Sequence, residues 1–182
     1  MSGKSQDEKS FLNMAGEFLV AAELNRRGIL CAVTYGAAKC ADVWAFSKTG
    51  NRSVRIEVKT TGPGSERWVV GNRILQQEGS PDVFWVLVKL PSPHPSEATT
   101  DEQRRGRHAP RFFVFTSAEM KQIMTEDAMR YKERYLRVHG HEFTGRGVPT
   151  LSLAKVQDFE NRWDKIKDRA QGSVSASPVQ PN

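Results

Sequence analysis

The chain has 182 residues, of which 38% are hydrophobic and 26% are charged. This length supports one domain with a full core, and the composition excludes a disordered chain. The net charge of +6 fits a polyanionic partner, although such an excess is also common on ordinary surfaces. We find neither an apolar run of the ~20 residues that a membrane span needs nor a signal-peptide core, so we expect a cytoplasmic protein with no membrane partner.

The first expected element is a helix from Ser10 to about Arg27, with Ser10 as its N-cap and Gly28 as its stop. One side of this helix is apolar, and Glu17 lies at the edge of the apolar arc. A carboxylate there has two explanations. It is either a half-exposed acid that the helix dipole favours, or an acid that leans towards a functional site beside the sheet.

Three strands are expected to follow this helix. Their ranges are Ile29–Tyr35, Cys40–Ser47 and Arg52–Thr60. In the third strand apolar and charged residues alternate, so one face carries the charged ones. These are Arg55, Glu57 and Lys59. The polar segment Lys48–Asn51 before this strand contains Gly and Asn, which predicts a hairpin.

The hairpin brings two carboxylates together. A two-residue or a four-residue loop within Lys48–Asn51 gives the same register, in which Asp42 lies directly opposite Glu57. Lys59 lies two residues further along the same face. Cross-strand neighbours are about 5 Å apart at Cβ, so the two carboxylates can share one divalent cation beside an ammonium group. Facing like charges repel, and the pair therefore invites a compensating cation.

The second half of the chain is expected to add two strands and two helices. Asp82–Leu90 is an apolar run between two prolines, which is typical of a strand buried on both faces. Arg111–Thr116 is a further strand, and Ser117 is the expected cap of a helix that runs to about Arg137. Ala154–Ala170 has the pattern of a final amphipathic helix. We expect one domain over residues 1–170 and a disordered tail over 171–182.

A long polar segment, Pro91–Pro110, separates the last two strands. It is rich in Pro and Ser and contains Arg104, Arg105 and Arg107 near its end. A structureless loop of ~20 residues is unusual inside a compact domain and is often functional. The three arginines are therefore candidates for contacts with nucleic-acid phosphates. The alternative is a solvated insertion with incidental arginines.

Two motifs resemble those of a known superfamily. An Asp followed, after a gap, by Glu-x-Lys on a strand resembles the PD-(D/E)xK nucleases, and here Ala41 replaces the proline that often precedes the Asp. Gly16-Glu17 resembles the first helix of the Holliday-junction-resolvase-like members, which place a glutamate at this point. The motifs cover residues 10–60, and residues 82–166 show a looser similarity of element order to small bacterial proteins that carry this nuclease core.

The resemblance implies an α/β fold, with a mixed five-stranded sheet flanked by helices in restriction-endonuclease-like order. It implies a Mg²⁺- or Mn²⁺-dependent deoxyribonuclease in which Asp42, Glu57 and the backbone carbonyl of Val58 bind the metal. Lys59 would hold the attacking water, and Glu17 would be an auxiliary acid. The alternatives are a non-catalytic nucleic-acid-binding module with the same fold and a basic interaction protein with coincidental charges on a hairpin. The expected partner of the nuclease is DNA, and the shape of the substrate and a homodimer are left open.

Overall fold

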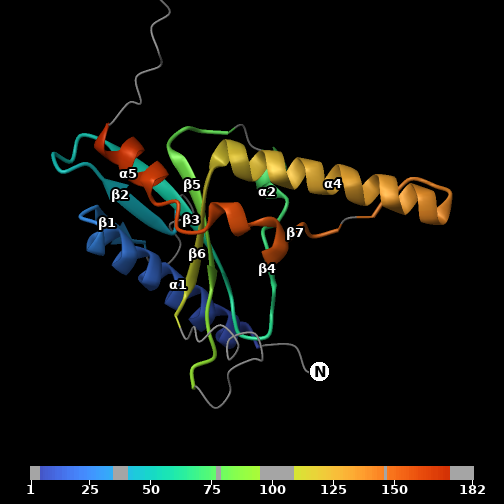
Figure 1. Ribbon diagram of the computed structural model, residues 1–182, viewed down its shortest axis with the longest axis horizontal. Coiled ribbons are helices and arrows are strands. Elements are labelled where there is room, and N and C mark those ends of the chain that lie inside the picture. Colours follow the sequence, from blue (N-terminus) through green and yellow to red (C-terminus); the bar gives the residue numbers. More distant parts are fainter. Residues whose placement is uncertain (1–4, 35–40, 77–78, 95–108, 146, 173–182) are drawn as a thin grey trace, which may run out of the picture.

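The computed structural model describes residues 5–34, 41–76, 79–94, 109–145 and 147–172. Its centre is a mixed sheet of five strands with helices on both faces, which confirms the expected α/β fold (Figure 1). The strands are β1 (Leu30–Val33), β2 (Val43–Phe46), β3 (Ser53–Thr61), β5 (Val83–Lys89) and β6 (Arg111–Thr116). They lie in the order β1-β2-β3-β5-β6, and only β3 and β5 run parallel in this sheet.

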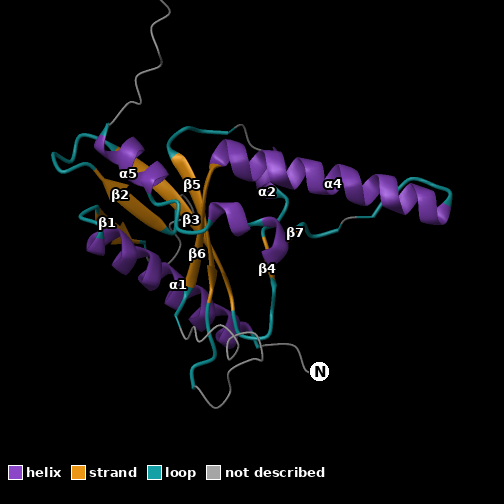
Figure 2. Cartoon of the chain, in the orientation of Figure 1, coloured by secondary structure: helices purple, strands orange, loops and turns teal. Residues whose placement is uncertain are grey.

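The helices form two groups on opposite faces of the sheet (Figure 2). They are α1 (Gln6–Arg26), α2 (Arg73–Gln76), α4 (Ser117–His139) and α5 (Asp164–Gln171). Helices α1 and α5 cover one face. Helices α2 and α4 cover the other, together with a two-stranded antiparallel sheet of β4 (Arg67–Val69) and β7 (Thr150–Ser152). None of the described helices is long and apolar enough to cross a membrane.

Strand β5 is the centre of both cores. Every residue of β5 after Val83 is buried, which confirms the expectation of a strand covered on both faces. Phe84, Val86 and Val88 join the core under α1 and α5. Trp85 and Leu87 join the other core, under α4 and the small sheet.

Both long helices begin before their expected caps. Helix α1 is capped by Ser5 instead of Ser10, because Ser5 and Glu8 exchange side-chain-to-backbone hydrogen bonds in a capping box. Helix α4 is capped by Thr116 through the same arrangement with Glu119, so Ser117 is its first residue. In each case a Glu three residues after the true cap satisfies a backbone N–H that the expected cap would leave free.

The expected helix over Ala154–Ala170 is wrong in its first half. Two 3₁₀ turns, η2 (Leu153–Lys155) and η3 (Gln157–Phe159), precede α5. Asn161 interrupts the helical path because it has a left-handed φ of 58° and its N–H donates to the carbonyl of Phe112 on β6. Helix α5 ends at Gln171 with Gly172 as its C-cap, so the first two residues of the expected tail belong to the helix end, and residues 173–182 lie outside the described residues.

Candidate functional site

The hairpin of β2 and β3 has the expected register. Val43 lies opposite Ile56, and the backbone N–H of Asp42 donates to the Ile56 carbonyl at 3.1 Å. The paired register ends there, and Asp42 follows at the end of β2, with its carboxylate beside Val58 and in electrostatic range of Glu57. At the turn the N–H of Ser47 donates to the carbonyl of Arg52, so the loop between the two strands has the four residues Lys48–Asn51.

The two carboxylates share a face with Lys59. The alternate residues Val54, Ile56 and Val58 are buried in the core under α1 and α5. Because strand side chains alternate, Glu57 and Lys59 point to the opposite face, and Asp42, just beyond the β2–β3 ladder, acts on Glu57 electrostatically. All three side chains are half-buried. The end of β2 and the middle of β3 therefore bring two acids and one amine close together.

The Asp42 carboxylate is held by the backbone of β3. Its Oδ2 accepts a hydrogen bond from the N–H of Val58 at 2.7 Å. Arg55 donates its N–H to Asp82 and Thr61 accepts from Leu90, so the odd-numbered residues of β3 bond to β5. The N–H and C=O of Val58 consequently both point to the β2 side, beyond the last ladder bond of the hairpin. The Val58 carbonyl therefore offers a further oxygen beside the Asp42 carboxylate.

Burial and charge both act on Glu57. Burial raises its pKa above the ordinary 4.5, and the facing Asp42 raises it further. Three cations oppose this change, namely Lys59, Arg73 and Arg55. Arg55 and Arg73 come from β3 and from α2, so the carboxylate pair lies in a field of positive charge that two separate elements supply.

Helix α1 approaches this site through Gly16. A Cβ built on Gly16 would overlap Oγ1 of Thr60 on β3, so only glycine allows the helix to lie this close to the strand. The next residue is Glu17, which is half-buried. Burial raises the pKa of Glu17, Asp42 raises it further, and Lys59 lowers it. The structure therefore places Glu17 within electrostatic range of both Asp42 and Lys59.

The charged groups of the site are not neutralised in pairs. Within the described ranges, no ion pair involves Glu17, Asp42, Glu57 or Lys59. The Lys59 ammonium instead lies over the ring of Trp85, 5.8 Å from its centroid. Trp85 is the β5 residue opposite Glu57. The amine is thereby supported by an aromatic face while its charge reaches the carboxylates.

The oxygen atoms available here suit a hard cation. Asp42 and Glu57 offer carboxylates and Val58 a carbonyl, and Mg²⁺ takes such ligands while keeping several waters. Across the part of the chain that the structure describes, no group of three or more His, Cys, Asp and Glu side chains could hold a metal ion. Glu17 therefore interacts electrostatically with Asp42, but it does not form a three-carboxylate metal site with Asp42 and Glu57.

Some residues expected at the site cannot be placed, and two residues near it were not expected from the sequence. Arg104, Arg105 and Arg107 lie outside the described residues. Arg73 and Trp44 were not expected at the site. The Asp-x-Trp spacing of Asp42 and Trp44 does carry a signal, since residues two apart on a strand share a face. No local signal points to Arg73, because the fold alone brings α2 beside Glu57.

Comparison with known proteins shows a loose likeness in structure and none in sequence. No protein-family model matches the chain, and no curated protein matches it in sequence. The chain is similar to the solved structure of a bacterial homing endonuclease, I-Ssp6803I, at 10% sequence identity and a TM-score of 0.43. The match covers 96% of this chain and 100% of that one. The chemistry of the site has to come from its own residues.

Proposed function

We propose that this protein is a divalent-metal-dependent endonuclease that hydrolyses phosphodiester bonds in DNA. The observation that carries the proposal is the gathering of three charged groups: Asp42, held by the Val58 N–H, acts on Glu57, and Lys59 lies two residues further along β3. The resemblance of these residues to the PD-(D/E)xK motif supports the same chemistry. So does the Gly16 contact, which sets a helix carrying Glu17 against the strand of the motif.

Asp42 and Glu57 would hold Mg²⁺ or Mn²⁺, with the Val58 carbonyl as a third oxygen. A bound ion of this kind polarises the scissile phosphate and promotes ionisation of a water. The hydrogen bond from the Val58 N–H fixes the Asp42 carboxylate before any ligand arrives. Bringing the two acids together costs stability, and this makes the pair receptive to a cation.

Lys59 provides the positive charge on the substrate side. Its ammonium can hold a water by donating hydrogen bonds and can offset the charge that develops on the phosphate oxygens. Its place over Trp85 keeps it near the carboxylates without a salt bridge to either. Arg55 and Arg73 add positive potential, which attracts a phosphate backbone to the same face.

Glu17 is the auxiliary acid of the proposal. It approaches the site from α1, where burial raises the pKa of Glu17 and the Asp42 charge raises it further. At this place it can accept hydrogen bonds from water molecules around the carboxylate pair. Loss of Glu17 should therefore weaken the activity less than loss of either Asp42 or Glu57.

The test is cleavage of DNA with and without metal. Labelled junction, flap, nicked and duplex DNAs are incubated with the purified protein in Mg²⁺, Mn²⁺ or EDTA. We expect cleavage that EDTA stops, and a fall of at least about 100-fold in Asp42→Asn and Glu57→Gln, as for loss of a charged group at a catalytic centre. Lys59→Met should lose cleavage and keep metal binding, which calorimetry measures. Glu66→Gln, an exposed acid outside the site, is the matched control.

Two results would overturn this proposal. If Glu57→Gln cuts as fast as the wild type, the activity comes from another site or another protein. If the wild type cuts none of these DNAs in either metal but still binds them, the chain is a non-catalytic nucleic-acid-binding module with the same fold.

A further inference from the structure

Trp44 lies on the same sheet face as the carboxylate pair. It is two residues from Asp42 along β2, which is about 7 Å in an extended strand. Its cross-strand neighbour on β3 is Arg55, and its neighbour on β1 is Ala32. Arg55 in turn precedes Glu57 by two residues, so Trp44 and Arg55 form the next row of the sheet beside the two acids.

Trp44 differs from the other three tryptophans of the chain. Trp68, Trp85 and Trp163 are 1%, 3% and 3% exposed and belong to the two cores. Trp44 is half-buried, and its ring makes no aromatic or cation–π contact within the described residues. The exposed part of this large ring, next to a charged site, can contact a ligand.

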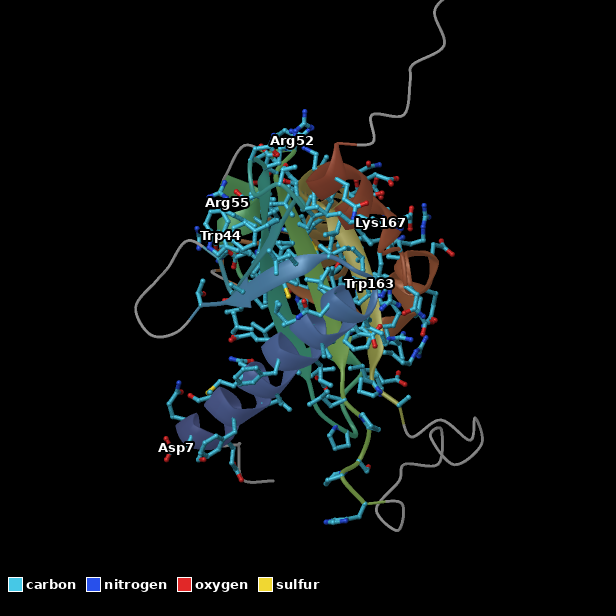
Figure 3. All side chains as sticks on the ribbon, turned by 90° about the vertical axis from the view of Figure 1, so that its left-hand side faces the viewer. Asp7, Trp44, Arg52, Arg55, Trp163 and Lys167 are labelled. Carbon is cyan, nitrogen blue, oxygen red and sulfur yellow. The ribbon has the colours of Figure 1, made fainter. Side chains whose placement is uncertain are left out.

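The described helices leave this row open. The helices that pack most closely on β2 are α1 and α5, and both lie on the opposite face, where Val43 and Ala45 are buried. Figure 3 shows Trp44 and Arg55 together on one side of the sheet, with Trp163 and Lys167 on the other. Leu30, on the same face as Trp44 through β1, is 58% exposed, as a side chain at an uncovered edge should be.

Positive charge surrounds the ring. Arg55 lies beside it in the register, and Arg55 and Arg73 both act on the neighbouring Glu57. An aromatic ring flanked by guanidinium groups fits a nucleotide, because the ring stacks on a base while the cation binds its phosphate.

We propose that Trp44 and Arg55 form a platform for one unpaired nucleotide beside the scissile phosphate, with the indole stacked on the base and the guanidinium on a phosphate. The proposal rests on the nuclease function proposed above and assigns it a substrate class. In a duplex both faces of each base are covered by neighbouring pairs, so a ring on a sheet surface can stack only on a base that is splayed or single-stranded. The preferred substrate is therefore DNA with an unpaired nucleotide next to the cut.

Tryptophan fluorescence can test the stacking without any cleavage. The protein is titrated in EDTA with a single-stranded oligodeoxynucleotide or with a blunt hairpin duplex of the same composition. Base stacking should quench the wild type with the single strand much more than with the duplex. Trp44→Phe should remove most of this quenching and keep most of the affinity, which anisotropy of a labelled strand measures. Trp163→Phe, on the opposite face, is the matched control and should keep the quenching.

Affinity separates the ring from the cation. Trp44→Leu should weaken single-strand binding by roughly 5- to 150-fold, the range for loss of one stacked base, and should leave duplex binding nearly unchanged. It should not alter the dependence of binding on salt, because stacking releases no counterions. Arg55→Gln should reduce the slope of that dependence by about 0.7, the share of one phosphate contact on a single strand.

The outcomes distinguish this platform from the nuclease itself. If Trp44→Leu and Trp44→Phe bind and quench like the wild type while cleavage still depends on Glu57, the platform is overturned and the nuclease stands. If single strands quench through Trp44 but the wild type cuts no DNA, the platform stands and the nuclease falls. Equal quenching of Trp44 by single strand and duplex would overturn the assignment to unpaired DNA.

Discussion

Replacing Glu57 with glutamine should stabilise the metal-free protein. Glutamine keeps the shape of the side chain and removes the charge that faces Asp42. Burial and Asp42 raise the pKa of Glu57 above 4.5, so its proton is bound more tightly in the folded protein than in the unfolded chain. The stability that this proton contributes is fully present below about pH 4.5 and is lost as the pH rises through the folded pKa. At pH 7 the ionised Glu57 therefore destabilises the fold.

The expected change is small without metal and reverses with it. Facing like charges in a strand pair cost about 0.2–1 kcal/mol, and 1 kcal/mol corresponds to about 2–4 °C in Tm for a chain of this size. Glu57→Gln should thus melt about 0.5–4 °C above the wild type at pH 7 in EDTA. Mn²⁺ at 100 times its Kd should stabilise the wild type by about 2.7 kcal/mol, or roughly 5–10 °C, and the variant much less. The order of the two melting temperatures should then reverse.

Thermal denaturation followed by circular dichroism measures both effects, at pH 7 and pH 4.5, with EDTA or Mn²⁺. Glu66→Gln serves again as the control and should follow the wild type throughout. A Glu57→Gln variant that is less stable than the wild type at pH 7 in EDTA would refute the reasoning, since the carboxylate would then make a net favourable contact. Equal stabilisation of both proteins by Mn²⁺ would place the ion elsewhere.

Two further predictions concern the supports of the site and of the fold. Gly16→Ala should destabilise the protein by roughly 1–3 kcal/mol in urea denaturation, because the new Cβ meets Oγ1 of Thr60, and adding Thr60→Ala should recover part of the loss. Burial disfavours the ionised Glu119, but hydrogen bonds from Lys165 and Thr116 outweigh it and lower the pKa of Glu119. The stability that the ionised Glu119 contributes is present above about pH 4.5 and is lost as the pH falls through its pKa in the folded protein. Glu119→Gln should therefore lower Tm at pH 7, with a difference that shrinks in acid.

The register of the hairpin was predictable because it depends on local chemistry. A short polar loop with Gly and Asn joins two strands whose alternation is clear, and the two-residue and the four-residue loop both give the same register. The strands β5 and β6 were equally clear, since both are apolar runs with sharp ends. The core elements and the central pair of the site therefore follow from the sequence.

The surroundings of that pair depend on contacts between distant segments. Arg73 acts on Glu57 because α2 follows β4, and β4 is placed by its pairing with β7 about 80 residues later. The sequence around β7 gives no strong strand pattern, so this arrangement was not expected. The contact of Gly16 with Thr60 was unpredictable for the same reason. A glycine in a helix indicates close packing, but it does not show which residue packs against it.

The end of β2 is what allows acids from both faces of the sheet to act together. Glu17 comes from the face covered by α1, whereas Glu57 points to the opposite face, and a continuous strand would separate them. The β2–β3 ladder ends at Val43, and the Asp42 carboxylate just beyond this end accepts a hydrogen bond from the Val58 N–H. Asp42 consequently raises the pKa of both glutamates, which do not act on each other. Trp44 lies within the β2 ladder, where the continuous sheet separates its two faces. Its ring can therefore act only on the face that carries Glu57.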